Sequence, residues 1–262
     1  MVRKKNSIIR VIVLCTGIIA LAMSMAFANG QKETAATISF AGSGGYPPFN
    51  YLTDSGDVVG FDVDVAQEIA NRLGLVLEYK TTAWDGIIEG LRAKRYDGIL
   101  GSMGITEARA QVVDFSIPYY ISGPQLIVRK DSGILGPENL GPQSRIGLVT
   151  GTTYEQDAMD LGVQAKLYED DNQTLLELLN GRVDGVLTDR IVGLGAIAKL
   201  HGGDTLMLAG PVLRTEKMGI AFHQDSDILR QQVDQILLDM QADGTFAEIS
   251  GKWFMGEDIT KE

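Results

Sequence analysis

Two residues of opposite charge, Arg109 and Asp189, stand near the ends of two apolar segments. Arg109 closes the run GSMGITEAR. In that run the backbone N–H groups of residues 101–105 and a helix start behind Thr106 can bind a carboxylate alongside the guanidinium. Asp189 follows the apolar segment Val183–Leu187 and suits an ammonium group.

A third segment adds polar groups to this set. Thr152 and Thr153 follow the strand-like segment Arg145–Val149 and bring hydroxyl groups and further N–H groups to a helix start. An anion site and a cation site on different halves of the chain would be bridged by a ligand that carries both charges on one carbon, which is a free amino acid. Taken singly, Arg109 also suits a helix surface beside a nearby acid, and Asp189 also suits a helix cap.

The elements that must position these residues alternate between strand and helix. In the first half we expect strands at Thr37–Ala41, Leu75–Tyr79 and Gly98–Leu100, and helices at Asp62–Leu73, with Asp62 as its cap, and Trp84–Leu91. After Pro142 we expect strands at Arg145–Val149 and Val183–Leu187, and helices at Tyr154–Leu161, Asp171–Asn180 and Ile191–Leu200. This alternation predicts parallel sheets with helical crossovers, and it predicts a ligand site beyond the carboxyl ends of the strands.

An internal echo links the two halves. The segment LRAKRYDGILGS starts at Leu91 and LNGRVDGVLTD starts at Leu179, and both read as a helix end, a basic residue, Asp-Gly and then an apolar strand. The echo predicts two lobes with equivalent strands. The alternative is that Asp-Gly is merely a common way to turn the chain before a strand.

The first 28 residues read as a cleavable secretory signal. Four basic residues precede the apolar run Val11–Leu21, and Ala26-Phe27-Ala28 follows as a small-x-small cleavage site. A membrane anchor is the alternative, but the run is short for a bilayer span. Cleavage after Ala28 would leave a polar tail, residues 29–36, and would place the mature protein in the periplasm.

The composition of the mature chain excludes several classes of function. Without the leader it holds 19 basic and 34 acidic residues, a net charge of −15 against −11 for the whole sequence. A nucleic-acid backbone or an anionic bilayer would repel such a chain. The single cysteine, Cys15, lies in the leader, so disulfides, cysteine nucleophiles and thiolate metal sites are excluded. We expect no metal, no cofactor and no catalytic residue.

At these residues the sequence resembles the periplasmic amino-acid-binding proteins of ABC importers, solute-binding protein family 3, which include the histidine, lysine-arginine-ornithine and glutamine receptors. The resemblance covers nearly all of residues 37–255. It is carried, in the family's order and spacing, by GYPPFNY, VVGFDVDVAQEIANRLG, WDGIIEGLRAKRYDGILGSMGITEAR, VDFSIPYY, VTGTTYEQ, GRVDGVLTD, MGIAF and DGTFAEISGKWF.

The resemblance implies roles for the charged groups and their neighbours. Arg109 would clamp the carboxylate of the ligand, helped by the amides of Gly104 and Thr153. Asp189 would take the α-ammonium group, with Ser102 also facing it.

The resemblance also implies that two aromatic residues, Tyr46 and Trp84, hold the ligand side chain between them. A core position is the alternative for Trp84. The full set of expected ligand-binding residues is Arg109, Asp189, Tyr46, Trp84, Ser102, Gly104, Thr153, Ser43 and Thr106.

Three departures from the family's pattern bear on the ligand. Gly104 stands where many relatives have Ser or Thr, Ser43 stands where receptors for basic amino acids often have Asp, and Val149 stands where the glutamine receptor has Lys. A cationic side chain between Tyr46 and Trp84 would gain roughly 0.5–2 kcal/mol of cation–π attraction. We therefore expect a polar L-amino acid, with a basic one preferred and glutamine next.

The architecture that the resemblance implies is α/β and two-lobed, the periplasmic-binding-protein fold, with each lobe a mainly parallel sheet flanked by helices and two hinge strands between them. Lobe 1 would comprise residues 37–122 and 219–262, and lobe 2 residues 123–218. The expected crossings are Ile121–Gln125 and Lys217–Ala221. Such a protein would act as a monomer that delivers a free amino acid to ABC importer permease subunits in the inner membrane.

Two other classes of function compete with this one. Cyclohexadienyl dehydratases and some transglycosylases look like this family in sequence, and an enzyme of that kind would need a carboxylate or a histidine poised near its substrate. The only histidines, His201 and His223, do not fall near the expected strand ends. A membrane-tethered sensor domain would need a later apolar run of spanning length, which the sequence lacks.

Overall fold

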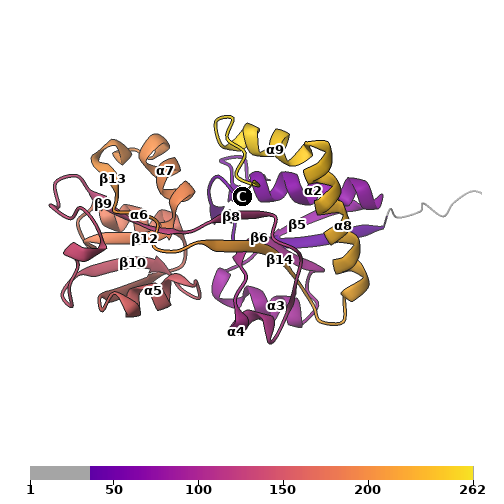
Figure 1. The fold of residues 1–262 in the computed structure, drawn as a ribbon, viewed down its shortest axis with the longest axis horizontal. Helices are drawn as coiled ribbons and strands as arrows, with labels where there is room; N and C mark the ends of the chain where they lie inside the picture. The colour runs from indigo at the N-terminus through magenta and orange to yellow at the C-terminus, as the bar shows by residue number, and fades with distance from the viewer. Residues whose placement is uncertain (1–35, 262) are drawn as a thin grey trace, which may run out of the picture. The chain divides into compact units, whose positions relative to one another are not determined.

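The computed structural model describes residues 36–261, and this part of the chain contains two larger sheets and a small three-stranded one (Figure 1). The predicted signal peptide, residues 1–28, lies outside the described residues, as does the predicted tail 29–36 apart from Ala36. None of the helices between residues 36 and 261 has the length and apolar composition needed to span a bilayer.

The first larger sheet has the strand order β5-β1-β6-β14-β7, with β8 also paired to β14. In Figure 1, α2, α8 and α9 gather on one side of this sheet and α3 and α4 on the other. Its strands are β1 (Thr37–Gly42), β5 (Val76–Thr81), β6 (Gly98–Gly104), β7 (Asp114–Phe115), β8 (Tyr120–Ser122) and β14 (Glu216–Phe222). Its helices are α2 (Phe61–Leu73), the 3₁₀ turn η1 (Trp84–Gly86), α3 (Ile87–Arg92), α4 (Glu107–Ala110), α8 (Asp227–Asp243) and α9 (Thr245–Trp253). The small sheet is formed by β2 (Gly45–Tyr46), β3 (Asn50–Leu52) and β4 (Val58–Val59).

Helix α2 forms where the apolar spacing predicts it, but Asp62 does not cap it. The helix buries Val65 and Ile69 and ends at Gly74, which adopts the left-handed conformation at φ 70°. Gly60 occupies the cap position instead, and the carboxylate of Asp62 is buried among side chains of other elements. Asp62 therefore belongs to the site described below.

The second larger sheet has the strand order β11-β10-β12-β9-β13. Helices α6 and α7 contribute to the apolar cluster on one face, and α5 contributes to the cluster on the other. Its strands are β9 (Pro124–Arg129), β10 (Arg145–Val149), β11 (Gln164–Tyr168), β12 (Gly185–Asp189) and β13 (Leu206–Ala209). Its helices are α5 (Tyr154–Asp160), α6 (Asp171–Leu179) and α7 (Arg190–Lys199), with 3₁₀ turns η2 (Pro137–Asn139) and η3 (Gly203–Thr205).

Each larger sheet combines a parallel and an antiparallel part. The parallel pairs are β1 with β5 and β6, and β10 with β11 and β12. Strands β9 and β14 add antiparallel pairs. The α/β class is therefore confirmed, with sheets more mixed than the alternation alone predicts.

The chain passes between the two larger sheets twice. The first passage lies at Gly123, between β8 and β9, inside the expected stretch Ile121–Gln125. The second lies in residues 210–215, between β13 and β14, and so precedes the expected Lys217–Ala221. Those residues instead lie within β14 and pair with strands of the first sheet. The apolar run Met218–Phe222 is buried in that sheet, so it cannot serve as the connection between the sheets.

The internal echo corresponds to two equivalent backbone arrangements. The N–H of Asp97 donates to the carbonyl of Ser39, and the Asp97 carboxylate accepts from the N–H of Ser39 at 2.8 Å. Asp184 makes the same pair of bonds with Arg145, also with a 2.8 Å bond to the carboxylate. Each Asp-Gly step thus joins the start of one strand to the neighbouring parallel strand.

Candidate functional site

A pocket of about 480 Å³, including its mouth, lies beyond the carboxyl ends of strands from both larger sheets. Residues that follow β1 and β10 line it, as do the last residues of β6 and the residues between β11 and α6. This is the location that the alternating strand and helix pattern predicts. Seven of the nine expected ligand-binding residues line the pocket: Ser43, Tyr46, Trp84, Ser102, Gly104, Arg109 and Thr153.

Arg109 is held at one end of the pocket by two backbone carbonyls, one at the end of β6 and one in the turn after β10. Its Nη1 donates to the carbonyl of Gly104 at 2.8 Å, and its Nη2 donates to the carbonyl of Gly151 at 3.1 Å. The guanidinium carbon lies 5.8 Å from the centre of the Trp84 ring. Burial lowers the pKa of Arg109, and the charge of Glu216 opposes that shift. The guanidinium keeps further N–H donors for an anionic group.

Thr106 does not line the pocket within the described part of the chain, but it supports Arg109 from behind. Its hydroxyl oxygen accepts the backbone N–H of Arg109 at 3.2 Å and caps α4. The predicted cap is therefore confirmed. Because Thr106 is not among the described lining residues, the structure gives no support for a direct contact between Thr106 and a ligand.

Asp189 is not among the described residues that line the pocket. It is fully buried at the start of α7, where one carboxylate oxygen accepts the N–H of Ile191 at 2.7 Å. Its other oxygen has no hydrogen-bond partner among the described residues. Burial raises the pKa of Asp189 to about 6. In this arrangement Asp189 is a helix cap, which was the simpler of its two sequence readings.

Ser102 lies in the pocket with a backbone conformation that is unusual for a residue with a side chain, φ 58°. Two buried residues hold it there. Its N–H donates to the Tyr119 hydroxyl at 3.0 Å, and its own hydroxyl donates to Asp62 at 2.9 Å. Because the Ser102 proton is directed toward Asp62, the free lone pairs of the hydroxyl oxygen are available to a donor in the pocket.

Asp62 is the centre of this buried network. Its carboxylate also accepts from the Tyr119 hydroxyl at 2.7 Å and from the Asn50 amide at 2.8 Å. Burial raises the pKa of Asp62 to about 6, although these hydrogen bonds oppose the shift. The motif GFDVDV marked Asp62 as a helix start, and only the packing reveals its link to Ser102.

Three aromatic residues complete the pocket. Tyr46 stacks on Phe49 with ring centres 5.3 Å apart, and its hydroxyl lies 3.4 Å from that of Tyr154. Trp84 lines the pocket and also packs against the apolar cluster around Ile87. Trp84 thus lies both at the pocket and against the core, and Tyr154 is an aromatic lining residue that the sequence reasoning missed.

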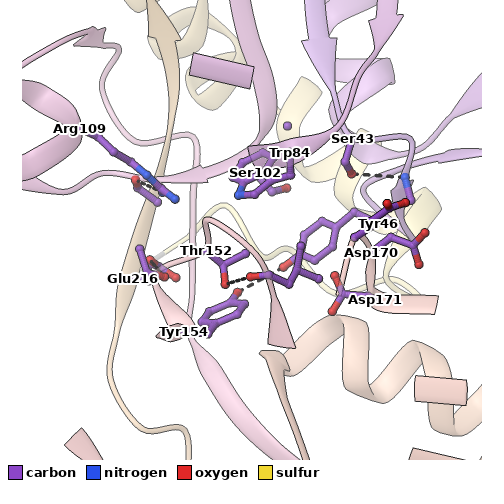
Figure 2. A pocket seen from close by; sticks show the side chains of 16 residues that line it. Ser43, Tyr46, Trp84, Ser102, Arg109, Thr152, Tyr154, Asp170, Asp171 and Glu216 are labelled. Atoms are coloured by element: carbon purple, nitrogen blue, oxygen red, sulfur yellow. Dashed lines mark hydrogen bonds between the residues drawn. The ribbon is translucent and has the colours of Figure 1, made fainter. Parts of the chain in front are cut away.

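Four carboxylates on the pocket lining were also missed: Glu169, Asp170, Asp171 and Glu216. Arg109 and Glu216 lie at one end of the pocket in Figure 2, and Asp170 and Asp171 lie beside Tyr46 at the other. We call these the Arg109 end and the Asp171 end. Burial, together with the charges of Asp170 and Asp189, raises the pKa of Asp171 to about 7. The acidic run before α6 could have been noticed as a cation site, whereas nothing around Glu216 in the sequence marks it.

Comparisons with known proteins agree with this fold. The family model for bacterial extracellular solute-binding proteins, family 3, matches residues 38–256. The L-cystine-binding protein TcyJ of Escherichia coli (strain K12) is 35% identical over 236 residues, which cover 89% of this chain and 87% of that protein. ABC transporter arginine-binding protein 1 of the same strain is 30% identical over 240 residues, with coverage of 90% and 96%.

Among solved structures, the ancestral amino acid-binding protein AncCDT-1, described as a precursor of cyclohexadienyl dehydratase, is similar with a TM-score of 0.78. It is 30% identical, and the match covers 84% of this chain and 96% of that one. The match of the family model to nearly the whole described chain, together with these relatives, shows that the chain belongs to family 3 of the bacterial extracellular solute-binding proteins.

Proposed function

We propose that this chain is an extracytoplasmic receptor that binds a free amino acid carrying a second, distal basic group and delivers it to the permease of an ABC importer. One observation carries the proposal. Among the described residues that line the pocket, one is basic and four are acidic. Such a lining matches a ligand with one carboxylate and more than one cationic group.

The two ends of the pocket suggest how such a ligand would lie. Its α-carboxylate would meet Arg109, whose planar donors suit a carboxylate. Its distal cationic group would meet Asp170 and Asp171, and the face of Trp84 would cover the chain between them. L-Arginine carries a distal guanidinium group, whereas L-cystine carries a second ammonium group together with a second carboxylate. The relatives named for arginine and cystine support both as candidates, with L-arginine first because its net positive charge matches the acidic lining. Glutamine comes next, because it is polar but lacks that charge.

A binding panel tests the ligand class. The mature protein is unfolded and refolded to remove carried-over ligand and is then screened by thermal shift against the twenty amino acids and L-cystine, with calorimetry on the hits. We expect L-arginine or L-cystine to bind most tightly. Tightest binding of leucine or glutamate would contradict the proposal.

The second candidate function is an enzyme on the same scaffold. The similarity to a precursor of cyclohexadienyl dehydratase is the observation that suggests it. Neither His201 nor His223 is among the described residues of the pocket lining. His223 instead accepts the N–H of Asp225 at 3.1 Å in an exposed turn. Carboxylates do line the pocket, but the relatives named above are binding proteins, and on that ground we favour a receptor. Release of unchanged ligand after prolonged incubation, measured by mass spectrometry, distinguishes the two.

The extracytoplasmic location follows from the family, whose description is of extracellular proteins. We propose that residues 1–28 direct export and are removed after Ala28, so that the mature protein works in the periplasm. N-terminal sequencing of the exported form should begin at or near Asn29. Retention of the leader on a membrane-bound protein would contradict this.

A further inference from the structure

Asp62 is fully buried and is not among the described residues of the pocket lining, yet its carboxylate is bonded to a residue that is. The carboxylate accepts three hydrogen bonds. Its Oδ1 accepts the Tyr119 hydroxyl at 2.7 Å. Its Oδ2 accepts the side-chain amide of Asn50 at 2.8 Å and the hydroxyl of Ser102 at 2.9 Å. Of these three donors, only Ser102 is among the described residues of the lining.

The direction of each of these bonds is fixed by the other contacts of the donor. The Tyr119 hydroxyl oxygen accepts the backbone N–H of Ser102 at 3.0 Å, so its single proton is left for Asp62. The side-chain oxygen of Asn50 accepts the N–H of Gly44 at 2.9 Å, so its NH₂ group faces Asp62. An ionised carboxylate has no proton to donate, so Ser102 also donates to it.

This network sets what Ser102 can offer to a ligand. The hydroxyl has one proton, and that proton is engaged by Asp62, so only lone pairs remain for the pocket. Ser102 holds this position with a left-handed backbone at φ 58°, which a residue with a side chain adopts only where its surroundings impose it. A hydroxyl that can only accept suits an ammonium group and cannot donate to a carboxylate.

We propose that Asp62 is a positioning residue that sets the hydrogen-bond polarity of Ser102, so that this hydroxyl accepts from the α-ammonium group of the ligand and cannot donate to the carboxylate. The inference rests on the proposed function, because it concerns a group of the same ligand. It leaves the ion pair with the ammonium group to Asp189, to which the resemblance assigns it. Asp62 then adds to the discrimination between an α-amino acid and the corresponding acid without the amino group.

The variant that tests this exchanges two side chains, Asn50→Asp together with Asp62→Asn. The carboxylate at residue 50 can still accept from Gly44, and it now needs a donor from residue 62. The amide at residue 62 therefore turns its NH₂ group toward residues 50 and 102 and its oxygen toward Tyr119. The Ser102 oxygen then accepts, and its proton is free to point into the pocket. Each of these polar groups keeps a partner, so the exchange reverses the polarity of Ser102 while it preserves the network.

The measurement compares each amino acid with its des-amino analogue. The probes are L-arginine with 5-guanidinopentanoic acid, and L-cystine with 3,3′-dithiodipropionic acid. Calorimetry at about pH 8, above the raised pKa of about 6 of Asp62, gives the preference of each protein for the amino acid. Two further variants are compared with the exchange. Ser102→Ala removes the hydroxyl, and Tyr119→Phe removes another hydrogen bond of Asp62 but leaves the bond from Ser102. Thermal unfolding without ligand verifies that each variant folds.

We expect the exchange and Ser102→Ala each to weaken binding of the amino acid about tenfold or more, because each removes a hydrogen bond to a charged group. Binding of the analogue should weaken by less than about threefold. In a Ser102→Ala background the exchange should cause no further loss of preference, because Asp62 acts through that hydroxyl. Tyr119→Phe should lower the unfolding temperature and keep the preference.

Retention of the preference in Ser102→Ala overturns the proposal, whether or not the exchange variant folds. A folded exchange variant that keeps the preference overturns the role of Asp62. An equal loss of preference in Tyr119→Phe also overturns it, because any damage to the network would then act alike. A wild type that binds none of the amino acids overturns the proposed function and this inference with it, whereas a binding wild type isolates the inference.

Discussion

At the scale of single residues, the pocket is defined by an imbalance of charge. Arg109 faces Glu216 at one end, while Glu169, Asp170 and Asp171 add three more carboxylates. The charge of Asp170 helps to raise the pKa of Asp171, and a cation bound beside these two carboxylates would relieve their repulsion. The ligand-free pocket is thus electrostatically incomplete, and a ligand with two cationic groups would complete it.

The first residue-scale prediction concerns Arg109. Arg109→Ala should cost roughly 2–5 kcal/mol of binding free energy, as expected when one partner of a buried charge pair is removed. Arg109→Lys should fail nearly as badly, because an ammonium group cannot reproduce the planar set of donors that now spans Gly104 and Gly151. Calorimetry with the tightest-binding amino acid measures both losses. Near-native affinity in the lysine variant would leave the carboxylate role of Arg109 without support.

The second residue-scale prediction concerns the pH dependence that Asp171 creates. Because burial raises its pKa from 3.8 to about 7, the folded protein holds a proton that the unfolded chain releases near pH 4. The folded state thus binds more protons between about pH 4 and pH 7, so this group makes the ligand-free protein less stable as the pH rises through that window. A cationic ligand needs the ionised form, so its affinity should fall by up to about tenfold per pH unit below pH 7.

Asp171→Asn supplies the matched control for that prediction. Asp62 and Asp189, whose pKa values are both raised to about 6, give stability slopes of the same sign, so the contribution of Asp171 is the difference between wild type and variant. Thermal unfolding and calorimetry between pH 5 and pH 8 should both show a flatter profile in the variant. Identical wild-type and variant profiles would show that Asp171 does not cause the pH dependence of stability or of affinity.

At the scale of elements, the two halves of the chain use the same device to start an inner strand. Asp97 precedes β6 and Asp184 precedes β12. Each donates its own N–H to a carbonyl of the neighbouring parallel strand and accepts an N–H of that strand with its carboxylate. Both strands run toward the pocket, and β6 carries Ser102 and Gly104 into it. The equivalence explains why the short Asp-Gly echo in the sequence marks two structurally matching strands.

The element-scale prediction is that Asp97→Ala and Asp184→Ala each lower stability and do so independently. Each leaves a backbone N–H of the neighbouring strand without its acceptor, at a cost of about 1–3 kcal/mol. That corresponds to roughly 2–4 °C in unfolding temperature per kcal/mol for a domain of this size. Because the two residues belong to different sheets, the double variant should lose about the sum.

The asparagine variants at both positions are the controls, since their side-chain oxygen can still accept the N–H. They should lose clearly less than the alanine variants. A double variant that loses much more or much less than the sum would show that the two turns are coupled, contrary to their separate sheets.

At the scale of the whole molecule, the pocket draws its lining from both larger sheets. Ser102 lies in β6 of the first sheet and Trp84 and Arg109 follow strands of that sheet, whereas Thr153 and Asp171 follow strands of the second. A ligand that contacts both groups of residues stabilises the form in which they are close together. It shifts an open-closed equilibrium only by its preference for the closed form.

The molecule-scale prediction is that the radius of gyration of the wild type decreases when the amino acid is added, as measured by small-angle scattering. Arg109→Ala should not compact at the same ligand concentration, because it no longer holds the carboxylate. Binding by the wild type without compaction would show that closure is not linked to the ligand.

The sequence by itself determined the elements whose information is local. Strand β10 forms at the expected residues, α2 ends at the expected glycine, and Thr106 caps α4, because apolar spacing and capping residues act within a few positions. Strand β11 escaped prediction because it is largely exposed and lacks an apolar run. Arg109 could be found because glycines, a cap and an arginine adjoin one another in the chain.

Only the tertiary structure decided which carboxylates line the pocket. Glu216 lines the pocket and accepts from Thr153 because β14 pairs with β6, and Asp62 reaches Ser102 because α2 packs against β6. Asp189 follows its strand as expected, yet it caps α7 and is absent from the described lining. The direction of a side chain at a strand end depends on neighbours distant in the sequence, and a pattern of residue types and spacings carries no information on that packing.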